Sequence, residues 1–343
     1  MKIVKQPGYN HLFDEKTGLS VRWGDTFDQD PVISPNGPEI ADIEITTKCS
    51  GPEGKVCKFC YKSNTPNGKN MSFETFKTIF SKLPNTLTQI AFGTDATATA
   101  NPDMWKIMEH CRHNNIVPNI TVANISIPTA YKLSQMCGAV AVSRYDNKDL
   151  CYDSVQRLTS FGMQQVNIHQ LLAEETFDNV IETIRDIKTD LRLTDLNAIV
   201  FLSLKQKGRG TGYTRLSQDK FNYIVKVAMA AGIPFGFDSC SANKFLNSVK
   251  NHKQYNKFIV NTEPCESTCF SLYVNVEGEY FPCSFTEGGS FDNAGNWTRG
   301  IPLNEVVDFK TELWENYKTR QFRKSLLSNV DDNGVRGCPL YEI

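Results

Sequence analysis

Short apolar runs alternate with amphipathic segments through the middle of the chain. The runs are rich in β-branched and aromatic residues, which predicts strands at 41–46, 88–92, 118–124, 138–144, 165–172, 197–204 and 234–238. Between them, apolar residues recur with the period of a helix, which predicts helices at 72–83, 102–115, 127–137, 152–161, 174–189 and 216–231. This alternation predicts an α/β protein whose parallel strands form a barrel or an open doubly wound sheet.

The two ends of the chain lack this alternation. Residues 1–40 are rich in turn formers and predict a hairpin-like segment. In the last hundred residues, cysteines cluster around a second predicted hairpin, and a helix is predicted over 304–327. We therefore expect an N-terminal segment at 1–40, an α/β region at 41–240 and a metal-stapled region at 241–343.

Charge and composition exclude some classes of function. The chain of 343 residues carries 37 basic and 38 acidic residues, a net charge of −1, and lacks the basic surplus of a strong nucleic-acid binder. It has neither a signal-peptide-like start nor a run of the ~18 apolar residues that cross a membrane. We expect a cytoplasmic protein with no membrane partner. Because thiols stay reduced there, its 11 cysteines indicate metal ligands, catalytic thiols or core residues rather than disulfides.

Three cysteines, Cys49, Cys57 and Cys60, follow the first predicted strand. In parallel sheets and barrels, reactive groups collect at the carboxyl ends of the strands. Cys57 and Cys60 have the spacing of a zinc knuckle, but a closed zinc site takes four ligands, and the only histidine within 40–110 is the distant His110. An iron–sulfur cubane held by three thiolates leaves one iron free for an outside ligand. Zinc and unrelated core cysteines remain the alternatives.

The cysteine loop resembles that of the radical S-adenosylmethionine (radical SAM) superfamily. In that family, the loop after the first strand of a partial barrel bears Cys-x3-Cys-x2-Cys with an aromatic residue before the last cysteine, here Phe59. Seven residues separate Cys49 from Cys57 where three are usual. The resemblance implies a partial (β/α)6 TIM-like barrel with a small C-terminal Fe–S-binding extension. It also implies that Cys49, Cys57 and Cys60 bind a 4Fe–4S cluster whose open iron takes S-adenosylmethionine.

The same resemblance implies cofactor contacts at two later strand ends. Gly93, Thr94 and Asp95 correspond to the family's turn that binds the amino group of the methionine moiety, with Asp95 in place of a glutamate. An ordinary turn is the alternative, since Gly and Asp are common in turns. Ser143 corresponds to a contact with the ribose or the methionine carboxylate, and Arg144 could pair with that carboxylate. A solvated surface charge is the alternative for Arg144.

Asn167 and His169 alternate with apolar residues on the fifth predicted strand, so both point to one face. If that face is the barrel interior, they are candidate catalytic residues; a structural role for His169 is the alternative.

The tail cysteines resemble the SPASM and twitch extensions of radical SAM enzymes. This resemblance implies one auxiliary 4Fe–4S cluster on Cys265, Cys269 and Cys283, with Cys338 or Cys240 as a fourth ligand. The member of that pair not used, such as Cys240, is a candidate hydrogen-atom donor. A zinc site made from the same ligands is the alternative.

The family resemblance implies reductive cleavage of S-adenosylmethionine to a 5′-deoxyadenosyl radical, which abstracts a hydrogen atom from the substrate. Barrels with such tails mostly modify peptides, so we expect a ribosomally made peptide that is crosslinked, epimerised or cut by backbone excision. Expected partners are this peptide, a separate leader-peptide-binding protein and a flavodoxin- or ferredoxin-type reductant. Two alternatives stay open: an enzyme like the molybdenum-cofactor cyclase, acting on a nucleotide, and a non-catalytic, zinc-stabilised binding module.

Overall fold

A central sheet organises the molecule. The computed structural model describes residues 1–332 and 334–343, and within them ten strands form one sheet in the order β10-β9-β8-β7-β6-β5-β4-β11-β12-β15. The strands predicted by the apolar runs lie side by side in this sheet and are parallel. They are β4 (Ile40–Glu44), β5 (Gln89–Gly93), β6 (Val117–Val122), β7 (Val140–Arg144), β8 (Val166–Leu172), β9 (Ala198–Ser203) and β10 (Phe235–Phe237). The predicted parallel α/β architecture is confirmed.

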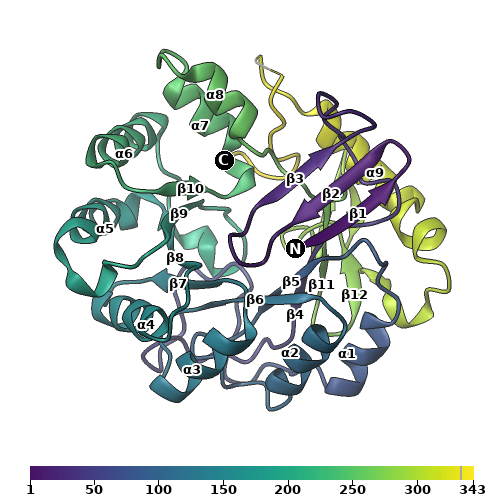
Figure 1. Ribbon diagram of the computed structural model, residues 1–343, viewed down its shortest axis with the longest axis horizontal. Helices are drawn as coiled ribbons and strands as arrows, with labels where there is room; N and C mark the ends of the chain where they lie inside the picture. The colour runs from purple at the N-terminus through teal and green to yellow at the C-terminus, as the bar shows by residue number, and fades with distance from the viewer. Residues whose placement is uncertain (333) are drawn as a thin grey trace.

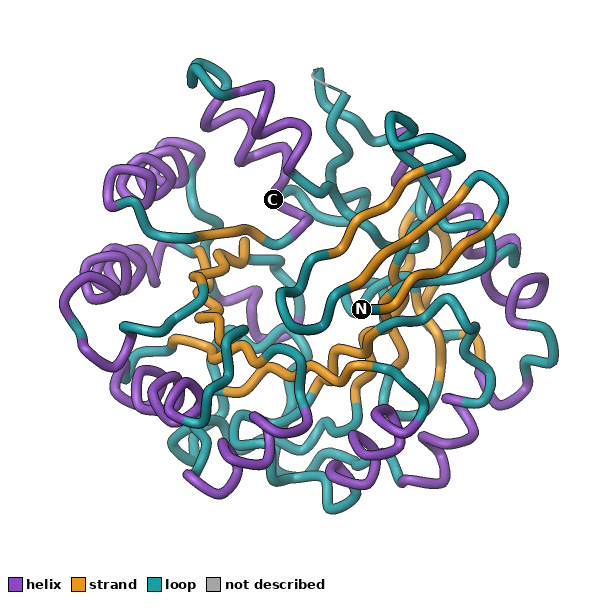
Figure 2. Tube along the Cα trace, in the orientation of Figure 1, coloured by secondary structure: helices purple, strands orange, loops and turns teal. Residues whose placement is uncertain are grey.

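Helices follow the successive strands and lie on the outer side of the curved sheet (Figures 1 and 2). Their starts obey ordinary capping rules: the Ser72 side chain accepts a hydrogen bond from the Thr75 amide, and Ser217 caps the last of the series in the same way. The helices are α1 (Phe73–Phe80), α2 (Met104–His113), α3 (Ile127–Met136), α4 (Lys148–Ser160), α5 (Phe177–Thr189) and α6 (Gln218–Ala231).

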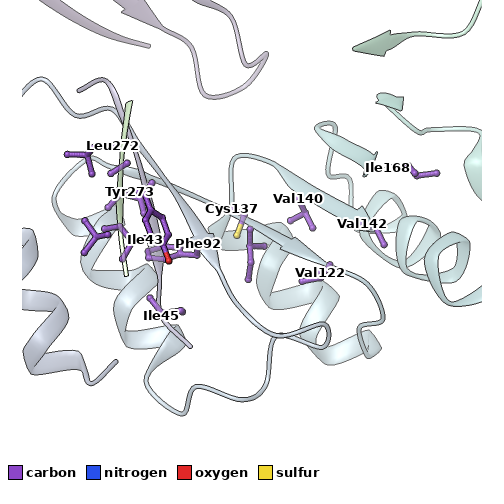
Figure 3. Packing of buried hydrophobic residues seen from close by; sticks show 14 of the residues in the cluster. Ile43, Ile45, Phe92, Val122, Cys137, Val140, Val142, Ile168, Leu272 and Tyr273 are labelled. Carbon is purple, nitrogen blue, oxygen red and sulfur yellow. The ribbon is translucent and has the colours of Figure 1, made fainter. Parts of the chain in front are cut away.

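The two faces of the parallel strands differ in polarity. Side chains such as Ile43, Phe92 and Ile168 point toward the helices and are buried in the core (Figure 3). Side chains alternate along a strand, so Asp42, next to Ile43, and His169, next to Ile168, point to the concave face. There they keep contact with solvent. The concave face of the sheet is therefore the polar, accessible interior of the partial barrel.

A separate antiparallel sheet crosses the front of the barrel in Figure 1; it consists of β1 (Lys2–Gln6), β2 (Tyr9–Phe13) and β3 (Ser20–Trp23). The prediction anticipated a hairpin here but not β1. Its β2–β3 turn lies at the amino-terminal end of the barrel strands, because the Glu15 carbonyl accepts a hydrogen bond of 2.8 Å from the side chain of Gln165, which directly precedes β8. The cysteine loop after β4 lies at the opposite, carboxyl-terminal end.

The C-terminal region continues the main sheet. β11 (Ser271–Val274) runs parallel beside β4, and β12 (Glu279–Phe281) and β15 (Ile301–Pro302) follow it in antiparallel pairs. The helix predicted over 304–327 is a π-helical turn at Lys310–Trp314 followed by α9 (Tyr317–Ser328). The remaining elements are α7 (Ala242–Val249), α8 (Tyr255–Asn261) and the pair β13 (Gly289–Phe291) and β14 (Gly295–Trp297). Across the described chain, every helix is too short or too polar to cross a bilayer.

Candidate active site

The loop that follows β4 brings Cys49, Cys57 and Cys60 together. All three side chains are half-buried, and their thiols influence one another electrostatically. Burial, followed by the neighbouring Cys49 and Cys60 sulfurs, raises the pKa of the Cys57 thiol to about 12. Three thiolates would therefore repel one another here unless a cation held them. A metal centre supplies such a charge, so the donor set fits a cluster.

The long gap between Cys49 and Cys57 is an anchored turn. The Pro52 carbonyl accepts a hydrogen bond of 3.1 Å from Asn124, beyond β6, and the Glu53 carboxylate accepts one of 3.0 Å from Asn147, beyond β7. Gly51 has a φ of +74°, and a Cβ there would lie 1.9 Å from the Lys55 carbonyl oxygen. The additional residues of the gap thus spread the loop over the carboxyl ends of neighbouring strands.

Phe59 lies among aromatic side chains beside the cysteines. Its ring centroid is 5.0 Å from that of Tyr145 and 5.6 Å from that of Tyr213. Tyr145 is close to the cysteines, since burial and then Cys57 raise the pKa of its hydroxyl. The sequence analysis missed Tyr145, although it directly follows Ser143 and Arg144.

Ser143 and Arg144 face opposite sides of the sheet. Ser143 lies on the concave face, in register with His169 of β8. The Arg144 side chain points to the helix layer, where it is 1% exposed and donates a hydrogen bond of 2.7 Å to Glu182 of α5. The prediction that Arg144 pairs with the methionine carboxylate is wrong, because adjacent strand residues alternate between faces.

Asp95 organises its own loop. Its carboxylate accepts hydrogen bonds from the backbone amides of Thr97, Thr99 and Ala100, each at 3.0 Å, and it is 5% exposed. Thr94 adds a hydroxyl donor at 3.2 Å. With both oxygens used in this way, the expected pairing of Asp95 with an amino group is not supported, and the alternative of a structural turn describes it better.

Gly93 packs closely against β4, which is a structural reason for a glycine at this position. A Cβ at Gly93 would lie 3.3 Å from the Cα of Glu44, and the Gly93 carbonyl accepts a hydrogen bond from the Ile45 amide.

Asn167 and His169 share one face of β8, in keeping with the alternation, and this face is the concave one. Asn167 accepts a hydrogen bond of 2.9 Å from Asn197 at the amino-terminal end of its strand. His169 makes no hydrogen bond with any residue that the structure describes, and burial lowers the pKa of its imidazole to about 4. The ring is therefore neutral near pH 7 and free to interact with a bound molecule.

Two carboxylates of β4 also line the interior, and the sequence analysis missed both. Asp42 is exposed to solvent within the concave interior, but desolvation by the surrounding protein, followed by the charge of Glu266, raises the pKa of its carboxyl to about 7. Glu44 is paired, since its carboxylate lies 3.2 Å from the Lys62 ammonium and 3.1 Å from the Tyr273 hydroxyl. The signal was the alternation of acidic and apolar residues in the strand itself.

The tail cysteines gather in a different set from the predicted one. The thiols of Cys240, Cys265 and Cys338 lie near one another, and their interaction lowers the pKa of Cys240 and raises those of Cys265 and Cys338. Burial and then Cys240 raise the pKa of Cys283 to about 11. Cys240, Cys265, Cys283 and Cys338 therefore converge, although they come from separate parts of the last 104 residues.

Cys269 lies apart from this group, so its predicted place in the ligand set is corrected. Its side chain is fully buried, and its sulfur accepts a hydrogen bond of 3.5 Å from Arg336. The physical reason is a tight turn in which the amide of Cys269 donates 2.9 Å to the carbonyl of Glu266. The two thiols have different surroundings: Cys265 interacts with Cys240 and Cys283, whereas Cys269 interacts with Arg336 and Arg323.

Contacts tie the two cysteine groups together. Tyr61, next to Cys60, stacks on Phe285 with a centroid distance of 4.4 Å, and its hydroxyl donates 3.1 Å to Ser284. A cavity of about 320 Å³ opens beside these contacts and is lined by charged residues including Lys62, Lys207 and Glu287. The loop of the first thiol group and the loop after Cys283 are thus in direct contact.

Known structures share this arrangement of elements. The structure of SuiB from Streptococcus suis bound to precursor peptide SuiA matches with a TM-score of 0.63 and 14% sequence identity, over 85% of this chain and 67% of that one. SuiB bound to S-adenosylmethionine matches with a TM-score of 0.60 and 13% identity, over 83% of this chain and 65% of that one. SuiB is a radical SAM enzyme.

The chain has a radical SAM fold. It spans about two thirds of the length of SuiB. No protein-family model and no curated protein sequence matches it. The structural likeness therefore establishes the radical SAM fold, while the residues of the site carry the argument about chemistry.

Proposed function

We propose that this protein is a radical SAM enzyme. The observation that carries the proposal is the convergence of Cys49, Cys57 and Cys60 in the loop after the first barrel strand. These residues would hold a 4Fe–4S cluster. Such a cluster would bind S-adenosylmethionine and receive an electron, for example from a flavodoxin- or ferredoxin-type reductant. The bound S-adenosylmethionine would then supply a 5′-deoxyadenosyl radical that abstracts a hydrogen atom from the substrate.

The barrel residues would orient the reactants and exclude water. Phe59 and Tyr145 provide an apolar wall beside the cysteines, and Ser143 and His169 present a hydroxyl and a neutral imidazole to the interior. Gly93 and Thr94 would contribute backbone and hydroxyl groups rather than a carboxylate, since Asp95 is engaged in its loop.

Cys240, Cys265, Cys283 and Cys338 would hold an auxiliary 4Fe–4S cluster. A zinc ion held by the same four thiolates is the alternative, and analysis of iron, sulfide and zinc distinguishes the two. Full ligation by protein would leave no vacant iron for substrate, which favours electron transfer over substrate binding. Cys240 would then be a ligand and not a hydrogen-atom donor.

A ribosomally made peptide is the proposed substrate, supported by the binding of precursor peptide SuiA to SuiB. The interior offers the acidic Asp42 and the neutral His169 to such a chain. A separate leader-binding protein would deliver it. The modification could be a crosslink, an epimerisation or an excision. Co-expression with short peptides encoded nearby, followed by mass spectrometry of the product, would identify it.

One experiment tests the enzyme class. Protein purified and reconstituted without oxygen should contain iron and acid-labile sulfide and should form 5′-deoxyadenosine from S-adenosylmethionine and dithionite. Zinc in place of iron and sulfide, with no 5′-deoxyadenosine, would instead favour a zinc-stabilised binding module.

A further inference from the structure

The segment after β9 reaches both cysteine groups. It covers residues 205–212 and includes a short 3-10 helix, η3 (Gly208–Gly212). Its sequence, KQKGRGTG, has the appearance of a flexible basic loop. The contacts below show that it is instead packed and hydrogen-bonded.

Arg209 binds the cysteine loop through three separate donors. Its backbone amide donates a hydrogen bond of 3.1 Å to the carbonyl of Cys60. Its side chain donates two more, from Nε to the carbonyl of Cys57 at 2.8 Å and from Nη2 to the carbonyl of Asn64 at 2.9 Å. The planar guanidinium can satisfy two carbonyls at fixed angles, which a lysine ammonium cannot reproduce. Arg209 therefore holds the backbone on both sides of the last cysteine.

Glycines allow this close approach. A Cβ at Gly208, where φ is +55°, would lie 2.3 Å from the carbonyl oxygen of Tyr61, and a Cβ at Gly210 would lie 3.2 Å from that of Phe59. A side chain at the first position would push the segment away from the cysteine loop.

The other end of the segment reaches the second cysteine group. The Lys207 ammonium donates 2.9 Å to the carbonyl of Ser284 and 2.8 Å to that of Glu287, in the loop that follows Cys283. Lys205 forms a buried ion pair with Asp238, two residues before Cys240. One short segment thus contacts the loops of both cysteine groups.

We propose that residues 205–212 act as a strut between the two cysteine groups, in which Arg209 positions the Cys49/Cys57/Cys60 loop and its charge adjusts the reduction potential of a cluster bound there. The effect on the reduction potential rests on the proposed function, because it needs a bound cluster. The positioning of the cysteine loop does not. Arg209 is a positioning residue, since it acts on the cysteine backbone. A fixed positive charge stabilises the reduced, more negative state of a nearby cluster, so its removal lowers the potential.

Three variants separate geometry from charge. Arg209→Lys keeps the charge but loses the planar guanidinium, and Arg209→Gln loses both. Gly208→Ala disturbs the close packing of residues 205–212 against the cysteine loop without changing a charge. Arg215→Gln is the matched control, because Arg215 lies on the same connection and pairs with the exposed Glu342.

The first measurement is amide hydrogen exchange of residues 49–65 in the metal-free protein. We expect exchange about tenfold faster in both Arg209 variants and in Gly208→Ala, the effect of losing one charged hydrogen bond, and no change in Arg215→Gln. Unchanged exchange in all three variants would overturn the strut. This measurement needs no cluster, so it stands even if the proposed function fails.

The second measurement is an EPR-monitored redox titration of the reconstituted protein, following the signal that changes on addition of S-adenosylmethionine. Arg209→Gln should lower that midpoint potential, while Arg209→Lys and Arg215→Gln should leave it near the wild-type value. Equal potentials in Arg209→Gln and wild type would refute the role of the charge. An equal shift in Arg209→Lys would show that geometry alone sets the potential.

Discussion

At the scale of single residues, one position along a strand decides between a role in the site and a role in the scaffold. On β7, Ser143 faces the barrel interior while Arg144 forms a buried ion pair under α5. On β8, His169 faces the interior while its neighbours are covered by helices. The pleat of the strand makes this separation, so only residues of the right parity can meet a cofactor.

Replacing Cys57 by Ala should abolish formation of 5′-deoxyadenosine, because two thiolates cannot retain a cluster with one open iron. The product is measured by chromatography after anaerobic reconstitution. Cys151→Ala is the control, since Cys151 is a buried core residue of α4 far along the chain, and it should keep wild-type iron content. Substantial cleavage by Cys57→Ala would refute the assignment of the cysteine trio.

The lowered pKa of His169 makes folding stability depend on pH. Its pKa falls from 6.5 to about 4 in the folded protein because burial disfavours the charged ring. The unfolded chain therefore binds more protons between these values, and stability is lost as pH falls from about 6.5 to about 4.

We expect His169→Gln to weaken this pH dependence. Urea denaturation between pH 4.5 and 7.5 measures it, and His113→Gln, on the exposed end of α2, is the control. Identical pH profiles for His169→Gln and wild type would show that the ring is not desolvated.

At the scale of elements, local sequence predicted much of the barrel. The strands β4 to β10 and the helices α1 to α6 lie within a few residues of the predicted ranges, because the burial of one face imposes the apolar period that the sequence displays. The contacts of the segment after β9 could not be predicted, since its glycines and basic residues indicate flexibility unless their partners are known. Those partners lie about 150 residues away, on the cysteine loop.

The turn between Cys265 and Cys269 predicts different effects for two neighbouring cysteines. Cys265→Ala should leave one iron of the auxiliary cluster without a protein ligand and so lower the iron content of the reconstituted protein, because Cys265 belongs to the converging group. Cys269→Ala should retain the wild-type iron content and lose only about 1 kcal/mol of stability, as expected for a small buried side chain. Iron analysis decides the matter, and the reverse result would restore Cys269 to the ligand set.

At the scale of the whole molecule, contacts of the partly buried Arg22 fasten the N-terminal sheet to the barrel. Arg22 of β3 forms ion pairs with Glu39, which precedes β4, and with Glu263 and Glu266 near the second cysteine group. Glu39 is 4% exposed, and it also accepts a hydrogen bond from Tyr9. The sheet over the amino-terminal end of the barrel is thus linked to the segment that carries Cys265.

Replacing Arg22 by Met should destabilise the protein by about 1–3 kcal/mol, because the buried Glu39 carboxyl, whose pKa burial raises to about 9, loses its hydrogen bonds from the Arg22 guanidinium. Chemical denaturation of the metal-free protein measures this loss. Lys77→Met is the matched control: its pair with Glu74 is exposed on α1, so it should cost less than about 1 kcal/mol. Equal effects of the two changes would mean that the N-terminal sheet contributes little to stability.

The sequence by itself determined the features that depend on near neighbours. These are the alternation of strands and helices, the shared face of Asn167 and His169, and the presence of three thiols in one loop. Each follows from a period or a spacing of a few residues, since such short-range patterns survive in any arrangement of the remaining chain.

Only the tertiary structure decided the features that join distant segments. It placed β11 beside β4, gathered Cys240 and Cys338 with Cys265 and Cys283, and set Arg209 against the cysteine loop. The reason is that sheet order and chain reversal determine which distant groups meet, and neither leaves a local period in the sequence.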